Sequence, residues 1–128
     1  MNRGYTYIAS PYSHSEQVMR VFRYEAVLKY TAYVFKLENF AFSPIVHCHE
    51  LAVKYTLPTD AAFWNQYNRC MLERAESLSV LCLSDWEKSL GVTEEIQWAW
   101  DLKLPVWYVH SVSYAMSKTP AWKTKKCH

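Results

Sequence analysis

The sequence predicts an α/β fold: a three-layer sandwich whose mostly parallel sheet of about five strands has helices on both faces. Short β-rich runs alternate with longer segments in which apolar residues recur every three or four positions, a pattern typical of parallel α/β proteins. Residues 78–84 (LSVLCLS) are almost continuously apolar, as expected of a strand covered on both faces. These observations indicate a flavodoxin-like or Rossmann-like architecture, and 128 residues suit a single domain.

The predicted strands are short runs bounded by turn residues or prolines. The first run (YTYIAS) stops at Pro11, and the second (FAFS) stops at Pro44, whose missing N–H cannot join a hydrogen-bond ladder. The predicted strands are residues 5–10, 40–43, 78–84 and 105–110, with a weak edge strand at residues 112–116.

Helix signals fall between these runs. Ser13 and Glu16 have the spacing of a capping box, which predicts that the first helix begins there. Residues 45–56 are expected to form a loop and a short helix, and further helices are predicted over residues 61–76 and 91–103. The side chains expected to face the sheet from the first helix are Met19, Phe22, Ala26, Tyr30, Tyr33, Val34 and Leu37.

Residues 1–116 are expected to form the domain, followed by a basic tail at residues 117–128. The net charge of +2 is too small to indicate a nucleic-acid surface, and we interpret the lysines of the tail as a solvated terminus. The chain does not open on a secretory signal pattern, and no run approaches the ~20 apolar residues of a membrane span. We therefore expect a cytoplasmic protein whose partners include neither a membrane nor a nucleic-acid polymer.

The cysteine and glycine patterns do not indicate a cofactor. The four cysteines show no CxxC spacing, so we expect reduced thiols. His47, Cys48 and His49 are the nearest approach to a metal-binding pattern, but they do not converge on one ion without ligands from elsewhere. With two glycines, the chain has neither a GxGxxG nor a GxxxxGK[ST] motif. We expect neither a metal nor an organic cofactor.

The ligand site is predicted at the carboxyl ends of the first and third strands, where the order of a parallel sheet reverses. Two loops lie there, residues 10–14 (SPYSH) and residues 85–91 (DWEKSLG), and each leads into a helix whose exposed N–H groups favour an anion such as phosphate. Glu95 is expected to face this crevice, while Glu94 points to water. The alternative for Glu95 is a surface acid that the helix dipole favours.

Three stretches carry a resemblance to a known family. They are residues 7–14 (YIASPYSH), residues 42–45 (FSPI) followed by His47 and His49, and residues 85–92 (DWEKSLGV) followed by Glu95. From residue 5 to residue 110 the chain resembles a family of small bacterial and phage proteins of uncharacterised function, of the DUF1937 or DUF4406 kind. That family resembles a branch of the nucleoside 2-deoxyribosyltransferase superfamily, and the spacing of Ser-Leu-Gly-Val to the Glu is also similar to the 2′-deoxynucleoside 5′-phosphate N-hydrolases.

The resemblance implies that Glu95 attacks C1′ of a nucleoside or nucleotide while the base departs through an oxocarbenium-like state. It also implies that Tyr7 orients this carboxylate, and that Ser89 and the Gly91 amide hold a 5′-phosphate or a 5′-hydroxyl. The predicted catalytic residues are thus Glu95 and Tyr7. The predicted substrate-binding residues are Ser10, Pro11, Tyr12, His14, Arg20, Arg23, Asn68, Asp85, Trp86, Ser89 and Gly91.

Several of these residues also have an ordinary structural alternative. The alternatives are a core aromatic for Tyr7, a helix cap for Ser89, solvated side chains for Arg20 and Arg23, and a surface group for His14. Trp64 and Trp86 are candidates to stack on a base, and the alternative for Trp64 is a core residue.

Three positions depart from the family pattern. Relatives commonly carry Asp at the positions of Asn68 and Glu76, and Gly at the position of Asp85. An amide still forms hydrogen bonds but cannot act as a base at neutral pH, so Asn68 puts hydrolysis itself in question.

We predict a nucleoside- or nucleotide-directed N-glycosidase, either a hydrolase or a deoxyribosyltransferase. One rival is a protein that sequesters a nucleotide in the same cleft without turning it over. A second is a structural oligomerisation module, suggested by the aromatic content of 16%. We also expect a homo-oligomer, because so small a domain closes a nucleotide cleft poorly and relatives often complete it with a neighbour's residues.

Overall fold

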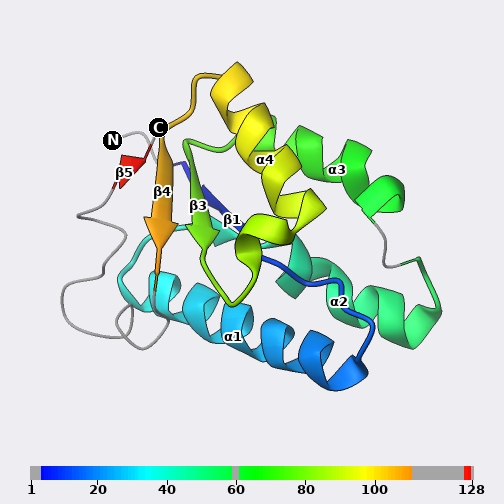
Figure 1. Ribbon diagram of the computed structural model, residues 1–128. Coiled ribbons are helices and arrows are strands. Elements are labelled where there is room, and N and C mark those ends of the chain that lie inside the picture. Colours follow the sequence, from blue (N-terminus) through cyan, green and yellow to red (C-terminus); the bar gives the residue numbers. More distant parts are fainter. Residues whose placement is uncertain (1–3, 59–60, 111–125, 128) are drawn as a thin grey trace.

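The computed structural model describes residues 4–58, 61–110 and 126–127, and it confirms the predicted α/β sandwich (Figure 1). The sheet has the strand order β2-β1-β3-β4-β5. Within the described residues, the parallel strands are β1 (Thr6–Ala9), β2 (Ala41–Phe42), β3 (Ser77–Leu81) and β4 (Val106–Val109). Next to β4 lies β5 (Lys126–Cys127), which runs antiparallel to it. The order reverses between β1 and β3, because β2 and β3 lie on opposite sides of β1.

Helices cover both faces of this sheet. Figure 1 shows α3 and α4 on one side of the sheet and α1 and α2 on the other. The helical segments are α1 (Gln17–Lys36), α2 (Pro44–Tyr55), α3 (Ala61–Glu73) and α4 (Leu90–Asp101), with a single 3₁₀ turn, η1 (Trp86–Lys88), in front of α4.

Alternate residues of the strands enter two separate cores, because successive side chains of a strand point to opposite faces. Tyr7 and Ala9 of β1 lie in the core beneath α3 and α4, whereas Ile8 lies in the core beneath α1. In the same way Tyr108 and Val109 of β4 enter different cores. The central strands are therefore buried on both faces, as the apolar run at residues 78–84 predicts.

The capping box predicted at Ser13 and Glu16 is wrong. Helix α1 begins at Gln17, and the side chain of Glu16 at the N-cap makes no capping hydrogen bond. The backbone N–H of Glu16 donates to Nδ1 of His14 at 3.0 Å, and the carbonyl of Ser13 accepts from Nη1 of Arg23 at 2.8 Å. The backbone groups of Ser13 and Glu16 therefore bond to Arg23 and His14, and neither side chain caps the helix.

The buried face of α1 differs from the predicted one near its N-terminus. Tyr30 and Val34 are buried as expected, but Phe22 is 60% exposed and its neighbour Arg23 is only 6% exposed. Apolar periodicity treats an arginine as a surface residue, whereas Arg23 is buried because its guanidinium donates to loop carbonyls.

Residues 44–55 form one continuous helix and not a loop followed by a short helix. Ser43 accepts the N–H of Val46 at 3.1 Å, and Pro44 takes the first helical turn, where its missing N–H would have no helical partner. The expected edge strand at residues 112–116 and the predicted domain end at residue 116 lie outside the described residues. The pairing of β5 with β4 was not predicted.

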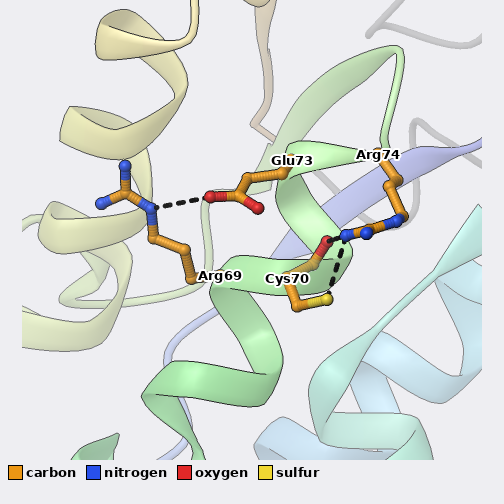
Figure 2. A network of polar contacts seen from close by, with 4 residues as sticks. All are labelled: Arg69, Cys70, Glu73 and Arg74. Carbon is orange, nitrogen blue, oxygen red and sulfur yellow. Dashed lines mark hydrogen bonds and ion pairs between the residues drawn. The ribbon is translucent and has the colours of Figure 1, made fainter.

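Helix α3 ends at Glu73, earlier than predicted, because the backbone N–H of Glu76 donates to the carbonyl of Tyr5 at 2.9 Å and so extends the sheet. Figure 2 shows the last turns of α3. Nη1 of Arg74 lies 3.0 Å from both the carbonyl oxygen and Sγ of Cys70, and Arg69 pairs with Glu73 at 3.6 Å. The Arg69–Glu73 ion pair is largely exposed, so it contributes about 0.3–0.5 kcal/mol to stability.

None of the helices in the described ranges combines the length and the apolar character needed to cross a bilayer.

Candidate active site

A cavity of about 580 Å³ opens at the carboxyl ends of β1 and β3, at the point where the strand order reverses. Both loops that the sequence singles out contribute to its lining. The lining residues from these loops are Ser10, Tyr12, Ser13, His14, Asp85, Lys88, Ser89 and, at the start of α4, Leu90 and Gly91. The fold therefore brings together two segments that lie more than 70 positions apart in the sequence.

Two further walls come from α2 and α3. Helix α2 contributes Pro44, Ile45, Cys48, His49 and Ala52, and α3 contributes Trp64, Asn65 and Asn68. Most of the α2 wall was missed as a functional surface, because its residues are apolar and typical of a core. The Phe-Ser-Pro-Ile stretch and the histidines behind it are the sequence signal that marks this wall.

Glu95 of α4 and Tyr7 of β1 form a buried pair beside this cavity. The phenol of Tyr7 donates a hydrogen bond to Oε2 of Glu95 at 2.5 Å. Tyr7 is fully buried, and Glu95 is 8% exposed and lines the cavity. The phenol fixes one carboxyl oxygen, and among the described residues Oε1 has no hydrogen-bond partner.

Burial raises the pKa of Glu95 to about 8. The hydrogen bond from Tyr7 opposes this shift, and the neighbouring Glu94 adds to it. The pKa of Tyr7 lies well above its usual value for the same reason, burial, reinforced by the charge of Glu95. At neutral pH the carboxyl of Glu95 is therefore mostly neutral. Glu94 is exposed, as predicted, and accepts a hydrogen bond from Asn65 at 3.1 Å.

The start of α4 forms one edge of the cavity. Ser89 caps the helix by accepting the N–H of Val92 at 3.2 Å. A Cβ on Gly91 would meet only Oγ of Ser89 at 3.9 Å, so the glycine leaves open space beside the first helical N–H groups. Asp85 has a φ of 66°, a left-handed conformation in which Gly is favoured, and it forms an exposed ion pair with Lys88 at 3.8 Å.

Arg23 is a buried cation that lines the cavity from α1. Its guanidinium donates to the carbonyl of Ser13 at 2.8 Å and, at 3.4 Å, to the carbonyl of Ser84. Arg23 thus connects the two loops. No carboxylate in the described part of the chain forms an ion pair with it.

Two buried polar atoms in the lining have no hydrogen-bond partner among the residues that the structure describes. They are Oγ of Ser10 and Oδ1 of Asn68. A buried polar atom left without a partner costs about 1–3 kcal/mol, so such atoms commonly mark a place where a ligand or water completes the bonding.

His49 is held at the cavity wall by two tyrosines. Its Nδ1 lies 2.6 Å from the hydroxyl of Tyr12, and its ring stacks on Tyr24 with centroids 4.0 Å apart. Burial lowers the pKa of His49, and the carboxylates of Glu50 and Glu25 oppose this effect. Both His49 and Tyr12 line the cavity.

Three of the predicted binding residues lie outside the lining. Pro11 is a buried residue of the first loop, and Arg20 donates to the carbonyl of His14. Trp86 packs against Tyr108 in the core beneath α4. Trp64 is the aromatic side chain that α3 presents to the cavity, and its Nε1 donates to the carbonyl of Pro58 at 2.8 Å.

The histidines and cysteines do not assemble a metal site in the part of the chain that the structure describes. His47 stacks on Tyr67, with centroids 5.7 Å apart, and so points to different partners from His49. Cys48 and Cys70 form no disulfide bond within the described part of the chain.

A family model described as "Domain of unknown function (DUF1937)" matches residues 4–111. The chain belongs to this family. The match spans every element of the DUF1937 fold from β1 to β4, and with it all of the cavity lining. The resemblance to an uncharacterised family of this kind is thereby confirmed. A comparison with curated proteins finds no match.

Proposed function

We propose that this protein is an N-glycosidase that cleaves the bond between the base and the sugar of a nucleoside or nucleotide, as a hydrolase or a deoxyribosyltransferase. The observation that carries the proposal is the Tyr7–Glu95 pair. It presents one carboxyl oxygen to a cavity of about 580 Å³ while a phenol holds the other at 2.5 Å. A nucleophile fixed in this way loses little freedom when it reacts.

In the proposed reaction Oε1 of Glu95 forms a bond to C1′ as the C1′–N bond breaks, and the departing base keeps the electron pair. The transition state resembles an oxocarbenium ion, which the carboxylate stabilises before it bonds. Water, or a second base, then attacks C1′ and frees Glu95. The reacting form is the ionised carboxylate, which is the minor form at neutral pH because the pKa of Glu95 is about 8.

The other walls suit the remaining parts of such a substrate. The cavity volume is in the range of small-molecule sites. The apolar side chains of α2 and the ring of Trp64 provide surfaces for a flat base. The unpartnered Oγ of Ser10 and Oδ1 of Asn68 are available to sugar hydroxyls.

Arg23 supports a phosphorylated substrate over an unphosphorylated one. An arginine keeps its charge even when buried, and a buried charge is costly unless an opposite charge accompanies it. The carbonyls of Ser13 and Ser84 satisfy some of its donors but carry no net charge. A 5′-phosphate near the start of α4 would supply the opposite charge and accept N–H groups there.

A second function, nucleotide sequestration without turnover, is favoured by Asn68. Its amide lines the cavity where the family resemblance implies an acid, and an amide cannot transfer the proton that departure of the base requires. In this case Glu95 would serve as a neutral hydrogen-bonding group.

The test is a chromatographic assay for free or exchanged base with nucleosides and their 5′-phosphates, each alone and with a second base. We expect wild type to release base and Glu95→Gln to reduce the rate at least about 10³-fold while keeping the ligand affinity. Glu94→Gln is the matched control, because Glu94 lies on the same helix and is exposed. Nucleotide binding without release of base would favour sequestration, and absence of binding would contradict both functions.

We also propose that the protein self-associates, because a small domain leaves its nucleotide site open on one side. The exposed apolar side chains of Val18 and Phe22 at the start of α1 support this proposal. Sedimentation of a monomer at micromolar concentration would contradict it.

A further inference from the structure

Departure of a base requires a proton, and the proposed function therefore needs a proton donor in the cavity. Asn68 cannot be this donor. The pKa of Cys48 is raised by burial to about 11, and burial also raises the pKa of Tyr12. Neither group gives up its proton readily at neutral pH.

The two histidines of the lining differ in how they are held. Nδ1 of His14 accepts the N–H of Glu16 in an exposed loop. His49 lies on the wall of α2, where the hydroxyl of Tyr12 binds Nδ1 and the ring of Tyr24 covers one face. Among the described residues Nε2 of His49 has no partner, and it is not a buried atom. Nε2 is therefore the ring nitrogen of this lining residue that is open to a further partner.

The surroundings of His49 suit a base more than a sugar phosphate. Its neighbours along the cavity-facing side of α2 are Ile45, Cys48 and Ala52, which offer apolar surface. The unpaired cation Arg23 and the start of α4, where an anion is favoured, belong to α1 and to the loop after β3. A substrate whose sugar lies at Glu95 and whose phosphate lies at Arg23 would direct its base toward α2 and α3.

We propose, on the basis of the proposed function, that His49 is the catalytic acid that protonates the departing base, and that Tyr12 and Tyr24 are its positioning residues. Oε1 of Glu95 bonds to C1′, the C1′–N bond breaks, and its electron pair stays on the base nitrogen, which takes the Nε2 proton of the imidazolium. Water then attacks C1′, gives a proton to His49 and releases Glu95 as a carboxylate. Both side chains return to their starting states.

Each tyrosine has a distinct part in this arrangement. Tyr12 keeps the imidazole ring from turning and accepts from Nδ1–H when the ring is protonated. Tyr24 stacks on the same ring at an interplanar angle of 19° and can stabilise the cation through its π face. Because burial lowers the pKa of His49, its imidazolium is a stronger acid than an exposed one, although it is less populated.

The experiment compares two kinds of leaving group in wild type and in His49→Gln. The first kind is the 2′-deoxynucleoside and ribonucleoside 5′-monophosphates, whose bases leave only when protonated. The second is 4-nitrophenyl ribofuranoside 5-phosphate and its 2-deoxy counterpart, whose nitrophenolate leaves without a proton. Gln keeps a hydrogen-bond donor but cannot release a proton.

We expect His49→Gln to lower kcat/KM on the nucleotides about 10²- to 10⁴-fold and to change kcat/KM on the nitrophenyl compounds less than about tenfold, because kcat/KM reports the steps up to departure of the leaving group and not the later attack of water. Tyr12→Phe should lower kcat/KM on the nucleotides to a smaller degree, with little change in KM. His47→Gln is the matched control, because it lies on the same helix and outside the cavity lining.

An equal loss on both kinds of substrate would overturn the inference, since it would show that His49 serves binding or folding, and so would an unchanged kcat/KM on the nucleotides. Glu95→Gln separates the two proposals, because loss of its nucleophile should abolish turnover of both substrate kinds. If wild type cleaves neither kind, the proposed function fails and this inference fails with it.

Discussion

Two buried ionisable side chains line the cavity from opposite faces of the sheet, and they respond differently to burial. Glu95 lies on α4 and Arg23 on α1. Each is less than a tenth exposed, and they do not form an ion pair with each other. Glu95 has a phenol as its partner, whereas Arg23 has two carbonyl groups.

The difference is that Glu95 can lose its charge and Arg23 cannot. With a pKa of about 8, the carboxyl of Glu95 is mostly neutral at pH 7, while the guanidinium keeps its proton in any folded protein. Of these two buried side chains, only Arg23 is therefore charged at neutral pH. This asymmetry favours an anionic ligand before any chemistry takes place.

The largest expected effect is on protein stability, because ionisation of the buried Glu95 carboxyl destabilises the folded protein. Its folded pKa of about 8 lies above the ordinary value of 4.5, so its favourable contribution is complete below pH 4.5 and is lost as the pH rises through 8. Glu95→Gln should therefore gain stability over wild type across this range, by at most about 5 kcal/mol above pH 8. Thermal unfolding of both proteins between pH 4 and pH 9 measures the difference.

Glu94→Gln serves as the control for this titration, since its side chain is exposed one position away on α4. Its stability should keep the wild-type loss with rising pH, with the midpoint moved slightly to lower pH because Glu94 adds to the raised pKa of Glu95. Parallel curves for wild type and Glu95→Gln would show that Glu95 is ionised at little cost and would remove the asymmetry between the two buried groups.

A smaller effect is expected when the permanent charge is removed. Arg23→Met should lower kcat/KM for a nucleoside 5′-phosphate about 100-fold relative to the unphosphorylated nucleoside, because it deletes charge-assisted hydrogen bonds. Lys29→Met, an exposed change on the same helix, should leave the ratio unchanged. If both substrates lose equally, Arg23 acts by holding the loops at Ser13 and Ser84 and not by binding phosphate.

The smallest effect is expected at the phenol. Tyr7→Phe removes the hydrogen bond that lowers the pKa of Glu95, so the acidic limb of kcat/KM should move to higher pH by about one to two units. Tyr5→Phe is a control, because the hydroxyl of Tyr5 donates to Met71 and lies outside the lining. If the acidic limb of kcat/KM lies at the same pH in Tyr7→Phe as in wild type, ionisation of Glu95 does not limit the reaction.

The parts of the fold that the sequence predicts are those set by local pattern. The apolar run before Asp85 marks a strand, and the Ser-Leu-Gly-Val stretch places Ser89 at a helix cap, where the structure finds it. The hydrogen bond between Tyr7 and Glu95 joins residues 88 positions apart, and it was expected only through the family resemblance.

The features that sequence did not predict depend on tertiary contacts. Arg23 is buried only because two loops turn their carbonyls toward it, which periodicity along α1 cannot show. The sequence marks His49 only as a candidate metal ligand and as part of the family pattern. Tyr12 and Tyr24, which hold its ring in place, come from other segments, so the sequence around His49 does not reveal them. In the same way Trp86 was expected at the ligand but packs on Tyr108.

The shortness of the outermost strands has a consequence for how the protein behaves at high concentration. The described sheet begins with β2 and ends with β5, and each consists of two residues. A strand of this length offers too few free N–H and C=O groups to recruit a strand from another molecule. The described edges of the sheet therefore offer little template for edge-to-edge aggregation.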